Sequence, residues 1–155
     1  MDALEKTSIE LLQVAIDRFW ETVPPVWNTV RGNVRSIATE CNEITLDQFH
    51  ILRHIRRGRG SVSELAEIQQ ISRPAISQAV DILVDKGLVS RTTNADDRRY
   101  IRLELTPAGN ELLNTIFKRN RGWMMEKMAG LSPDEIDCIV HGLEVLKKTF
   151  IEQNK

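Results

Sequence analysis

The sequence has few of the residues from which disulfide, metal and catalytic sites are usually built. Its 155 residues include two cysteines, Cys41 and Cys138, which lie far apart without Cys-x-x-Cys spacing, and three scattered histidines. This pattern predicts neither a disulfide framework nor a zinc cluster. The sequence also lacks a glycine-rich phosphate loop and a nucleophile elbow. We therefore expect no catalytic residue, no metal and no cofactor, and the protein is not predicted to be an enzyme.

Long hydrophobic runs are also missing. The apolar runs extend over only a few residues, which is too short for a segment that crosses a bilayer. The N-terminus, MDALEKTSIELLQVAIDRF, is acidic and amphipathic and differs from a secretory signal. The sequence therefore predicts a cytoplasmic protein without a membrane partner.

No charge of one sign dominates the chain as a whole, which has 21 basic and 22 acidic residues. The charges are unevenly placed, however. Residues 51–102 hold ten Lys/Arg against six Asp/Glu, a net charge of +4, which leaves −5 for the rest of the chain. A basic centre between acidic flanks is typical of a module that binds a polyanion, although charge alone also fits an ordinary solvated surface.

The spacing of apolar residues predicts a mainly α-helical protein. Two helices are expected before residue 41, with an interruption at Pro24-Pro25, because proline lacks an amide donor and restricts the preceding residue. Capping boxes then start helices at Thr45, Ser61 and Ser132. Two long helices follow residue 106.

The centre of the chain predicts a winged helix-turn-helix. A short helix at residues 63–69 and a helix at residues 72–86 are joined by about three residues, and Gly87 ends the second helix. Two short strands then flank the polar tip NADD and form a small β-hairpin, the wing. This geometry exposes the start of the second helix, which can enter the major groove of DNA.

The exposed residues of the second helix and the wing are the predicted DNA contacts. Arginine can pair with guanine, glutamine with adenine, and alanine can meet the thymine methyl group, while an arginine on a rigid tip can enter the minor groove. The alternatives are a solvated helix face and a structural Asp96–Arg98 salt bridge, and Arg99 could take either role of Arg98. The predicted DNA-binding residues are Ser72, Arg73, Ala75, Ser77, Gln78, Arg91, Asp96, Arg98 and Arg99.

The segment SVSELAEIQQISRPAISQAVDILVDKGLVSRTTNADDRRYIRLELTPAG resembles the winged-helix core of the MarR (multiple antibiotic resistance regulator) family. The resemblance spans roughly residues 45–113 and includes the SELA helix, the KGLVSR exit, the DDRR wing and the LTPAG re-entry. It implies a homodimeric transcriptional regulator, in most members a repressor, that binds near-palindromic operators and is often released by a small aromatic or anionic effector. The family's DxR wing motif corresponds to Asp96 and Arg98. The segment before Pro24 is longer than the usual N-terminus of the family.

The terminal helices carry more apolar residues than a winged helix can cover, so we expect a homodimer. The predicted organisation is N-terminal helices at 1–40 for part of the dimerisation, a DNA-binding domain at 45–106, and C-terminal dimerisation helices at 107–155. Packing of these helices on their own chain is the alternative. The apolar residues that need a partner surface are Leu12, Ile16, Phe19, Trp123, Leu143, Leu146 and Phe150.

An effector pocket is expected between the dimerisation helices and the DNA-binding domain, where arginine would bind an anion and tryptophan a ring. Core or interface packing explains the same residues, which are Trp20, Trp27, Arg31, Arg35, Phe49 and His54. Two other functions stay open. One is a redox-sensing regulator that uses Cys41, and the other is a winged-helix protein-interaction scaffold without DNA binding.

Overall fold

A computed structural model describes residues 3–93 and 101–152 of the chain. The chain divides into two compact units, one up to Asn120 and one from Arg121 onward. The elements of the first unit are α1 (Ala3–Asn42), α2 (Leu46–Arg56), α3 (Val62–Gln69), α4 (Arg73–Asp85), β1 (Val89–Thr93), β2 (Ile101–Leu105) and the start of α5 (Pro107–Met128). The second unit holds the end of α5, α6 (Pro133–Lys147) and a π-helical segment, Lys148–Glu152.

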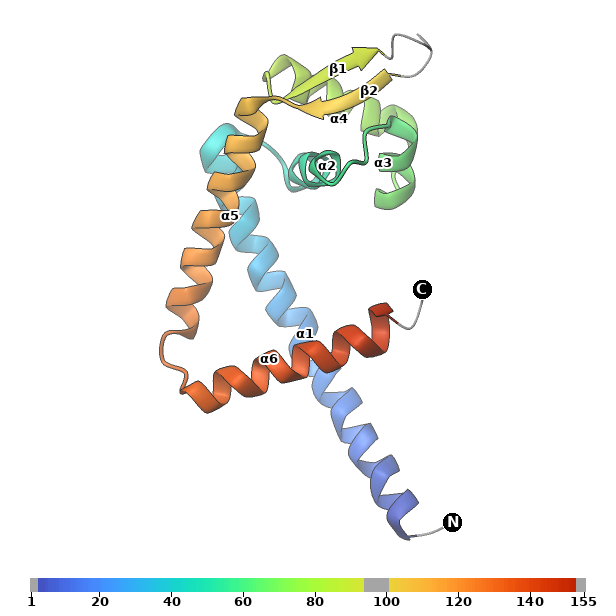
Figure 1. The fold of residues 1–155 in the computed structure, drawn as a ribbon, viewed down its shortest axis with the longest axis vertical. Helices are drawn as coiled ribbons and strands as arrows, with labels where there is room; N and C mark the ends of the chain where they lie inside the picture. Colours follow the sequence, from blue (N-terminus) through green and yellow to red (C-terminus); the bar gives the residue numbers. More distant parts are fainter. Residues whose placement is uncertain (1–2, 94–100, 153–155) are drawn as a thin grey trace. The chain divides into compact units, whose positions relative to one another are not determined.

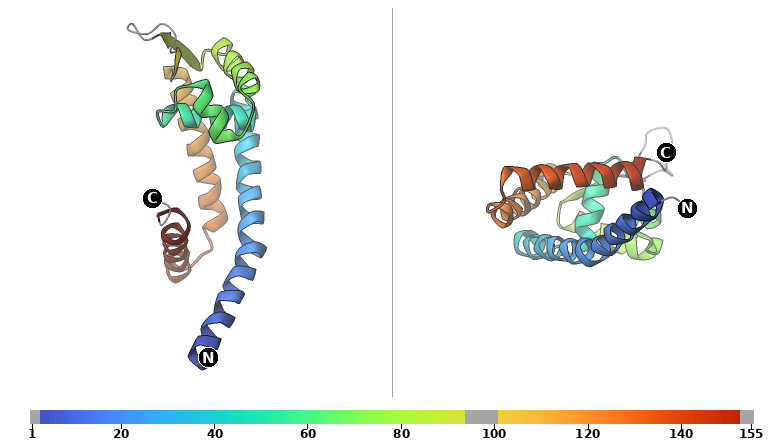
Figure 2. Two further views of the ribbon diagram at one scale, coloured as in Figure 1. Left: turned by 90° about the vertical axis from the view of Figure 1, so that its right-hand side faces the viewer. Right: turned by 90° about the horizontal axis from the view of Figure 1, so that it is seen from below.

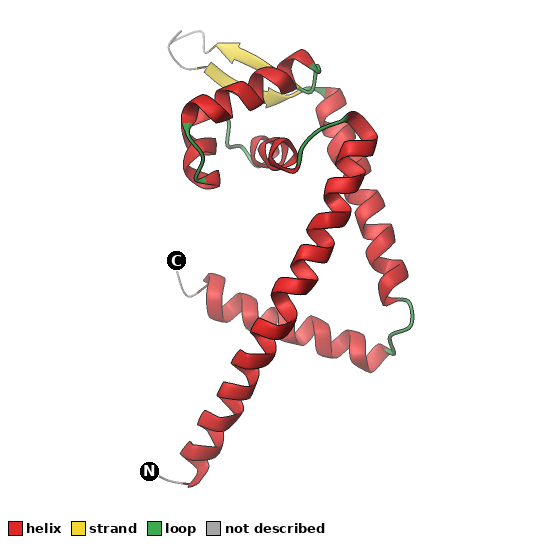
Figure 3. Ribbon diagram, turned by 180° about the vertical axis from the view of Figure 1, so that it is seen from behind, coloured by secondary structure: helices red, strands yellow, loops and turns green. Residues whose placement is uncertain are grey.

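The mainly helical fold class with one small hairpin is confirmed (Figures 1 and 3). Strands β1 and β2 pair antiparallel, with Val89 opposite Leu105 and Arg91 opposite Leu103. The three predicted capping boxes at Thr45, Ser61 and Ser132 are all present. Among the described residues, no helix is long and apolar enough to cross a membrane.

The prediction of a break at Pro24-Pro25 is wrong, because α1 runs through both prolines as one helix of 40 residues. The carbonyl groups that lose an amide partner belong to Trp20 and Glu21, which are exposed, so water can replace the missing donors. Thr29 adds a side-chain hydrogen bond from Oγ1 to the carbonyl oxygen of Pro25 at 2.9 Å. Helix α1 bends along its length instead of ending (Figure 2).

The core lies in the winged helix and the segments that flank it. All buried apolar side chains of the described residues fall between Ile37 and Ile116, and the most enclosed include Leu52, Leu65 and Leu83. These three side chains come from α2, α3 and α4, so the core fixes the three helices against one another. The part of α1 before Ile37 and all of α6 contribute no buried residue among those described.

The hairpin is joined to the start of α5 by a close backbone approach. Thr106 donates from its amide to the carbonyl oxygen of Leu88 at 3.1 Å and from Oγ1 to that of Gly87 at 2.6 Å. The amide of Gly109 donates to Thr106 Oγ1 at 3.1 Å. A Cβ atom at Gly109 would lie 2.1 Å from the carbonyl oxygen of Leu88, so only glycine fits here.

Candidate nucleic-acid interface and effector cavity

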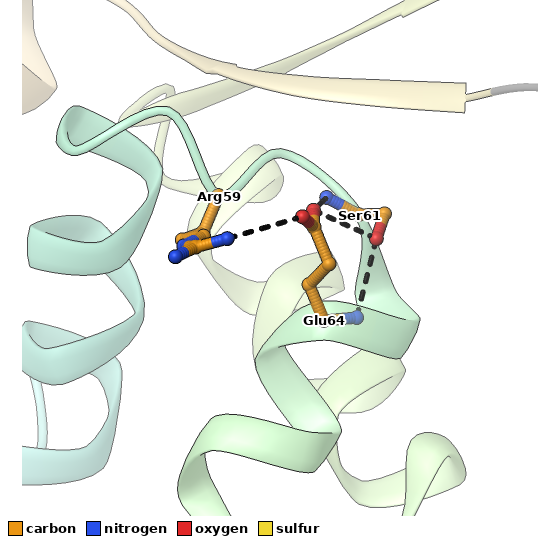
Figure 4. A network of polar contacts seen from close by, with 3 residues as sticks. All are labelled: Arg59, Ser61 and Glu64. Carbon is orange, nitrogen blue, oxygen red and sulfur yellow. Dashed lines mark hydrogen bonds and ion pairs between the residues drawn. The ribbon is translucent and has the colours of Figure 1, made fainter. Parts of the chain in front are cut away.

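The start of α3 is held by a polar network at the end of the α2–α3 loop (Figure 4). The amide of Glu64 donates to Ser61 Oγ at 3.2 Å, and the amide of Ser61 donates to Glu64 Oε2 at the same distance. Arg59 Nη1 lies 3.8 Å from the other carboxylate oxygen of Glu64. These contacts pair the first amides of a helix of only eight residues, which favours helix formation at this point.

The turn between α3 and α4 has the predicted length. Gln70 adopts a left-handed conformation with φ of 54°, and the amide of Ile71 donates to the carbonyl oxygen of Ala66 at 3.1 Å. Ser72 then caps α4 by accepting a hydrogen bond at Oγ from the amide of Ala75 at 3.4 Å. The chain therefore leaves α3 and enters α4 within three residues, which exposes the first turns of α4.

The predicted contact residues of α4 lie on two sides of its exposed surface. Arg73, Ser77 and Asp81 follow one another at four-residue spacing; Arg73 is exposed and Ser77 is half-buried. Ala75 and Gln78, both exposed, lie on another side and line a groove of about 340 Å³ toward the start of α2. Arg73, Ala75 and Gln78 are exposed to solvent, so α4 can present these three side chains to a groove of DNA.

Arg91, one of the predicted DNA contacts, forms an ion pair within the protein. Its position opposite Leu103 puts it on the inner face of the hairpin, where its guanidinium pairs with Asp81 of α4. The sequence analysis did not predict this pair. This ion pair connects strand β1 of the wing to α4. Asp96, Arg98 and Arg99 lie outside the described residues.

Three of the six predicted effector residues line one cavity. Trp27 and Arg31 of α1 meet Phe49 of α2 around a volume of about 180 Å³. Trp20, Arg35 and His54 do not line it. The sequence analysis missed the other seven lining residues, among them His50, Arg53 and Phe117. Of these, Arg53 stands four residues after Phe49, a helical spacing that the sequence already shows.

This cavity combines aromatic rings with cations. The rings of Phe49 and Phe117 lie 5.7 Å apart, and the Arg53 guanidinium lies 5.8 Å from the first ring and 5.9 Å from the second. Burial lowers the pKa of His50, and the nearby guanidinium groups of Arg53 and Arg31 lower it further. The walls therefore carry positive charge on arginine while the histidine tends to stay neutral.

Cys41 lies at the end of α1 beside a cation from α5. Arg119 donates from Nη1 to the Sγ atom at 3.3 Å, and its Nη2 atom lies 2.6 Å from Glu40 Oε2. The Cys41 thiol is half-buried and the Cys138 thiol is exposed. Neither forms a disulfide. A redox-sensing role for Cys41 stays a prediction.

Comparison with known proteins identifies the winged helix. A family model described as MarR family matches residues 43–99. The match covers 57 of the 155 residues, so this segment of the chain is similar to the MarR family. A relative in Bacillus subtilis (strain 168), the HTH-type transcriptional regulator YpoP, is 26% identical over 124 residues, which cover 79% of this chain and 86% of the relative.

Solved structures share the fold of this chain. The transcriptional regulator Tm0710 from Thermotoga maritima has a TM-score of 0.75 at 23% identity, and the match covers 89% of this chain and 96% of that one. RV1404 from Mycobacterium tuberculosis has a TM-score of 0.76 at 18% identity, with 88% and 94% covered. A mutant of S. aureus MepR, solved bound to an oligodeoxyribonucleotide, has a TM-score of 0.65 at 19% identity, with 84% and 96% covered. The winged-helix fold class is thereby confirmed.

Proposed function

We propose that this protein acts as a homodimeric, sequence-specific repressor that binds a near-palindromic DNA operator and leaves it when a small effector binds. The observation that carries the proposal is the open N-terminal part of α4. Arg73, Ala75 and Gln78 are exposed there on a helix that the core holds rigidly. These are side chains that can read base edges in the major groove.

Exposed apolar surface supports the homodimer. Leu12, Ile16, Leu143 and Phe150 are between 46% and 62% exposed, although they are large apolar side chains. Burying them against a second copy would remove this surface from water. A twofold dimer would also set two α4 helices about one turn of DNA, roughly 34 Å, apart.

The cavity lined by Trp27, Arg31, Phe49 and Arg53 supports the effector part of the proposal. Its aromatic walls fit a ring, and its two guanidinium groups fit an anionic substituent. Such a ligand regulates DNA binding only if it prefers one of two arrangements of the dimer. The proposed effector is therefore a small aromatic anion.

The experiment that tests DNA binding selects genomic fragments with the purified protein and then measures affinity for the selected site. Binding should weaken steeply as salt rises, because neutralised phosphates release counterions. Gln78→Ala should cost about 1–3 kcal/mol at one base position. Gln13→Ala, which removes an exposed glutamine of α1, is the matched control and should leave affinity unchanged.

Four outcomes would contradict the proposal or part of it. A failure to select any site would remove sequence-specific DNA binding, and a flat salt response would remove DNA as the partner. A loss on Gln78→Ala that is the same for every DNA sequence would make that residue a backbone contact. For the wing, Arg98→Ala should weaken operator binding while the dimer stays intact, and unchanged affinity would rule out its role in the minor groove.

A further inference from the structure

A second arginine-lined cavity lies at the outer edge of β2, apart from the proposed effector cavity. It has a volume of about 200 Å³ and is bounded by the end of α2, the α2–α3 loop, strand β2 and the start of α5. Arg56 of α2 and Arg102 of β2 both line it. We propose that this cavity is a binding site for a small oxyanion of the phosphate class, held between these two guanidinium groups.

Arg56 is already held in position on one side of the cavity. Its Nη1 atom donates to Asn114 Oδ1 at 2.9 Å, and its guanidinium carbon lies 4.9 Å from the centre of the Phe117 ring. A guanidinium has five donors in a planar fork, so these contacts leave donors for a ligand. An arginine that is ordered before binding loses less conformational entropy when the anion arrives.

Arg102 lines the cavity from β2, where its stem lies close to the α2–α3 loop. The amide of Leu103 donates to the carbonyl oxygen of Gly60 at 2.7 Å, which fixes the loop along the edge of β2. A Cβ atom at Gly60 would lie 3.1 Å from Arg102 Cγ and equally close to the carbonyl oxygen of Leu103. Glycine at this position therefore lets the stem of Arg102 lie against the loop at the mouth of the cavity.

The one carboxylate in the lining does not block the site. Glu104 Oε1 lies 3.8 Å from Arg102 Nε, which is longer than a hydrogen bond, and both side chains are more than half exposed. A pair of this kind contributes little to stability. An anion that contacts two guanidinium groups with several oxygens replaces it at small cost.

Two sources can supply such an oxyanion: free phosphate, or a phosphodiester group of bound DNA. The first experiment therefore uses inorganic phosphate on the full-length protein without DNA, at constant ionic strength set with sodium chloride. Backbone amide signals in a ¹H–¹⁵N spectrum are followed during the titration. We expect saturable shifts at Gly58, Gly60 and Leu103, which line the cavity.

The variants separate a built site from general charge attraction. Arg56→Gln and Arg102→Gln should each weaken phosphate binding by roughly five- to tenfold, while Arg102→Lys keeps the charge but loses the fork and should fall between. Arg57→Gln removes the neighbouring exposed arginine, which does not line the cavity. This control should leave the affinity within about twofold, and circular dichroism checks that every variant folds.

A second experiment identifies the source with the selected operator DNA bound. If a DNA phosphodiester occupies the site, free phosphate no longer shifts the three amides, and Arg102→Gln lowers the salt slope of DNA binding by about one. If the site serves free phosphate, the shifts persist in the complex. Either result supports an oxyanion site.

The proposal is overturned if the free protein shows no saturable shifts and the salt slope is unchanged by Arg102→Gln. It is also overturned if Arg57→Gln weakens phosphate binding as much as Arg102→Gln does. The titration of the free protein does not depend on DNA. A failure of the proposed repressor function would therefore be seen separately, as the absence of a selected operator.

Discussion

The winged helix and the last helix start in the same way but end in different surroundings. Both α3 and α6 begin with a complete Ser-x-x-Glu capping box, at Ser61–Glu64 and Ser132–Glu135. Helix α3 buries Leu65 and Ala66 in the core, whereas α6 buries no residue. The comparison shows that local signals are sufficient to specify a helix, whereas burial of its apolar side requires a neighbouring element. For α6 we propose that this neighbour is a second copy of the chain.

The largest expected effect comes from breaking that proposed contact. Leu143→Glu places a charge on an apolar side chain of α6 that is 61% exposed. If the dimer buries this residue, the variant should be monomeric and should bind the operator about 100-fold more weakly, because two linked half-site contacts become one. Analytical ultracentrifugation and fluorescence anisotropy measure the two effects.

The matched control for this variant is Glu144→Gln, which changes an adjacent exposed residue of α6 and should preserve the dimer. A wild-type protein that is already monomeric would contradict the proposed dimer. A Leu143→Glu protein that stays dimeric would show that α6 lies outside the interface.

The next largest effect is a difference in stability between alanine variants of two glycines, Gly109 at the start of α5 and Gly142 in α6. Gly109→Ala should lower the free energy of unfolding by about 1–3 kcal/mol, because the new Cβ would overlap the carbonyl oxygen of Leu88. Gly142→Ala has open space around it inside α6 and should raise stability by about 0.5–1 kcal/mol. Urea unfolding measures both, and equal changes in the two variants would contradict the close approach at Gly109.

A smaller effect is expected when each capping box is removed. Ser61→Ala and Ser132→Ala should each cost about 1 kcal/mol of local helix stability. Because α3 is part of the core, Ser61→Ala should shift the global melting temperature of the winged helix. Ser132→Ala should instead increase hydrogen exchange mainly at the start of α6. Identical exchange patterns in the two variants would show that both helices unfold together.

The smallest effect concerns pH. The pKa of His50 is lowered in the folded protein by burial and by the charges of Arg53 and Arg31, although Asp47 opposes this. Below its ordinary pKa of about 6.5 the unfolded chain binds more protons than the folded chain, so stability is complete above that pH and declines as pH falls. His50→Gln should reduce this decline between pH 7 and 5, as measured by urea unfolding at each pH.

The pKa of His54 is also lowered, chiefly by burial, so a smaller decline in stability should remain in the His50 variant. The double variant His50→Gln/His54→Gln should reduce it further. An unchanged decline in both variants would assign the pH dependence to other groups.

Much of the fold could be predicted because its signals are local. Capping boxes, the glycine after α4 and the alternation in β2 each involve a few neighbouring residues, and each led to an element that the structure contains. The prolines in α1 show the limit of such rules. A proline pair removes two amide donors, but exposed carbonyl groups can turn to water, so the helix continues with a bend.

The candidate site was less accessible from sequence, because side-chain partners come from separate elements. The pairing of Arg91 with Asp81 depends on which face of the hairpin Arg91 occupies, and the sequence does not fix that register. The effector cavity depends likewise on α1, α2 and α5 meeting, which brings Phe117 to Phe49 across 68 positions of the chain. Arg73 and Gln78, which lie on one helix, are exposed as the sequence predicts, because helical periodicity is sufficient to predict exposure.

The close backbone contact between Gly109 and Leu88 connects the base of the β-hairpin rigidly to the first turn of α5. Three hydrogen bonds through Thr106 close this connection, and no side chain separates the two backbones. We therefore expect the β-hairpin to move together with the first turn of α5 when this helix tilts.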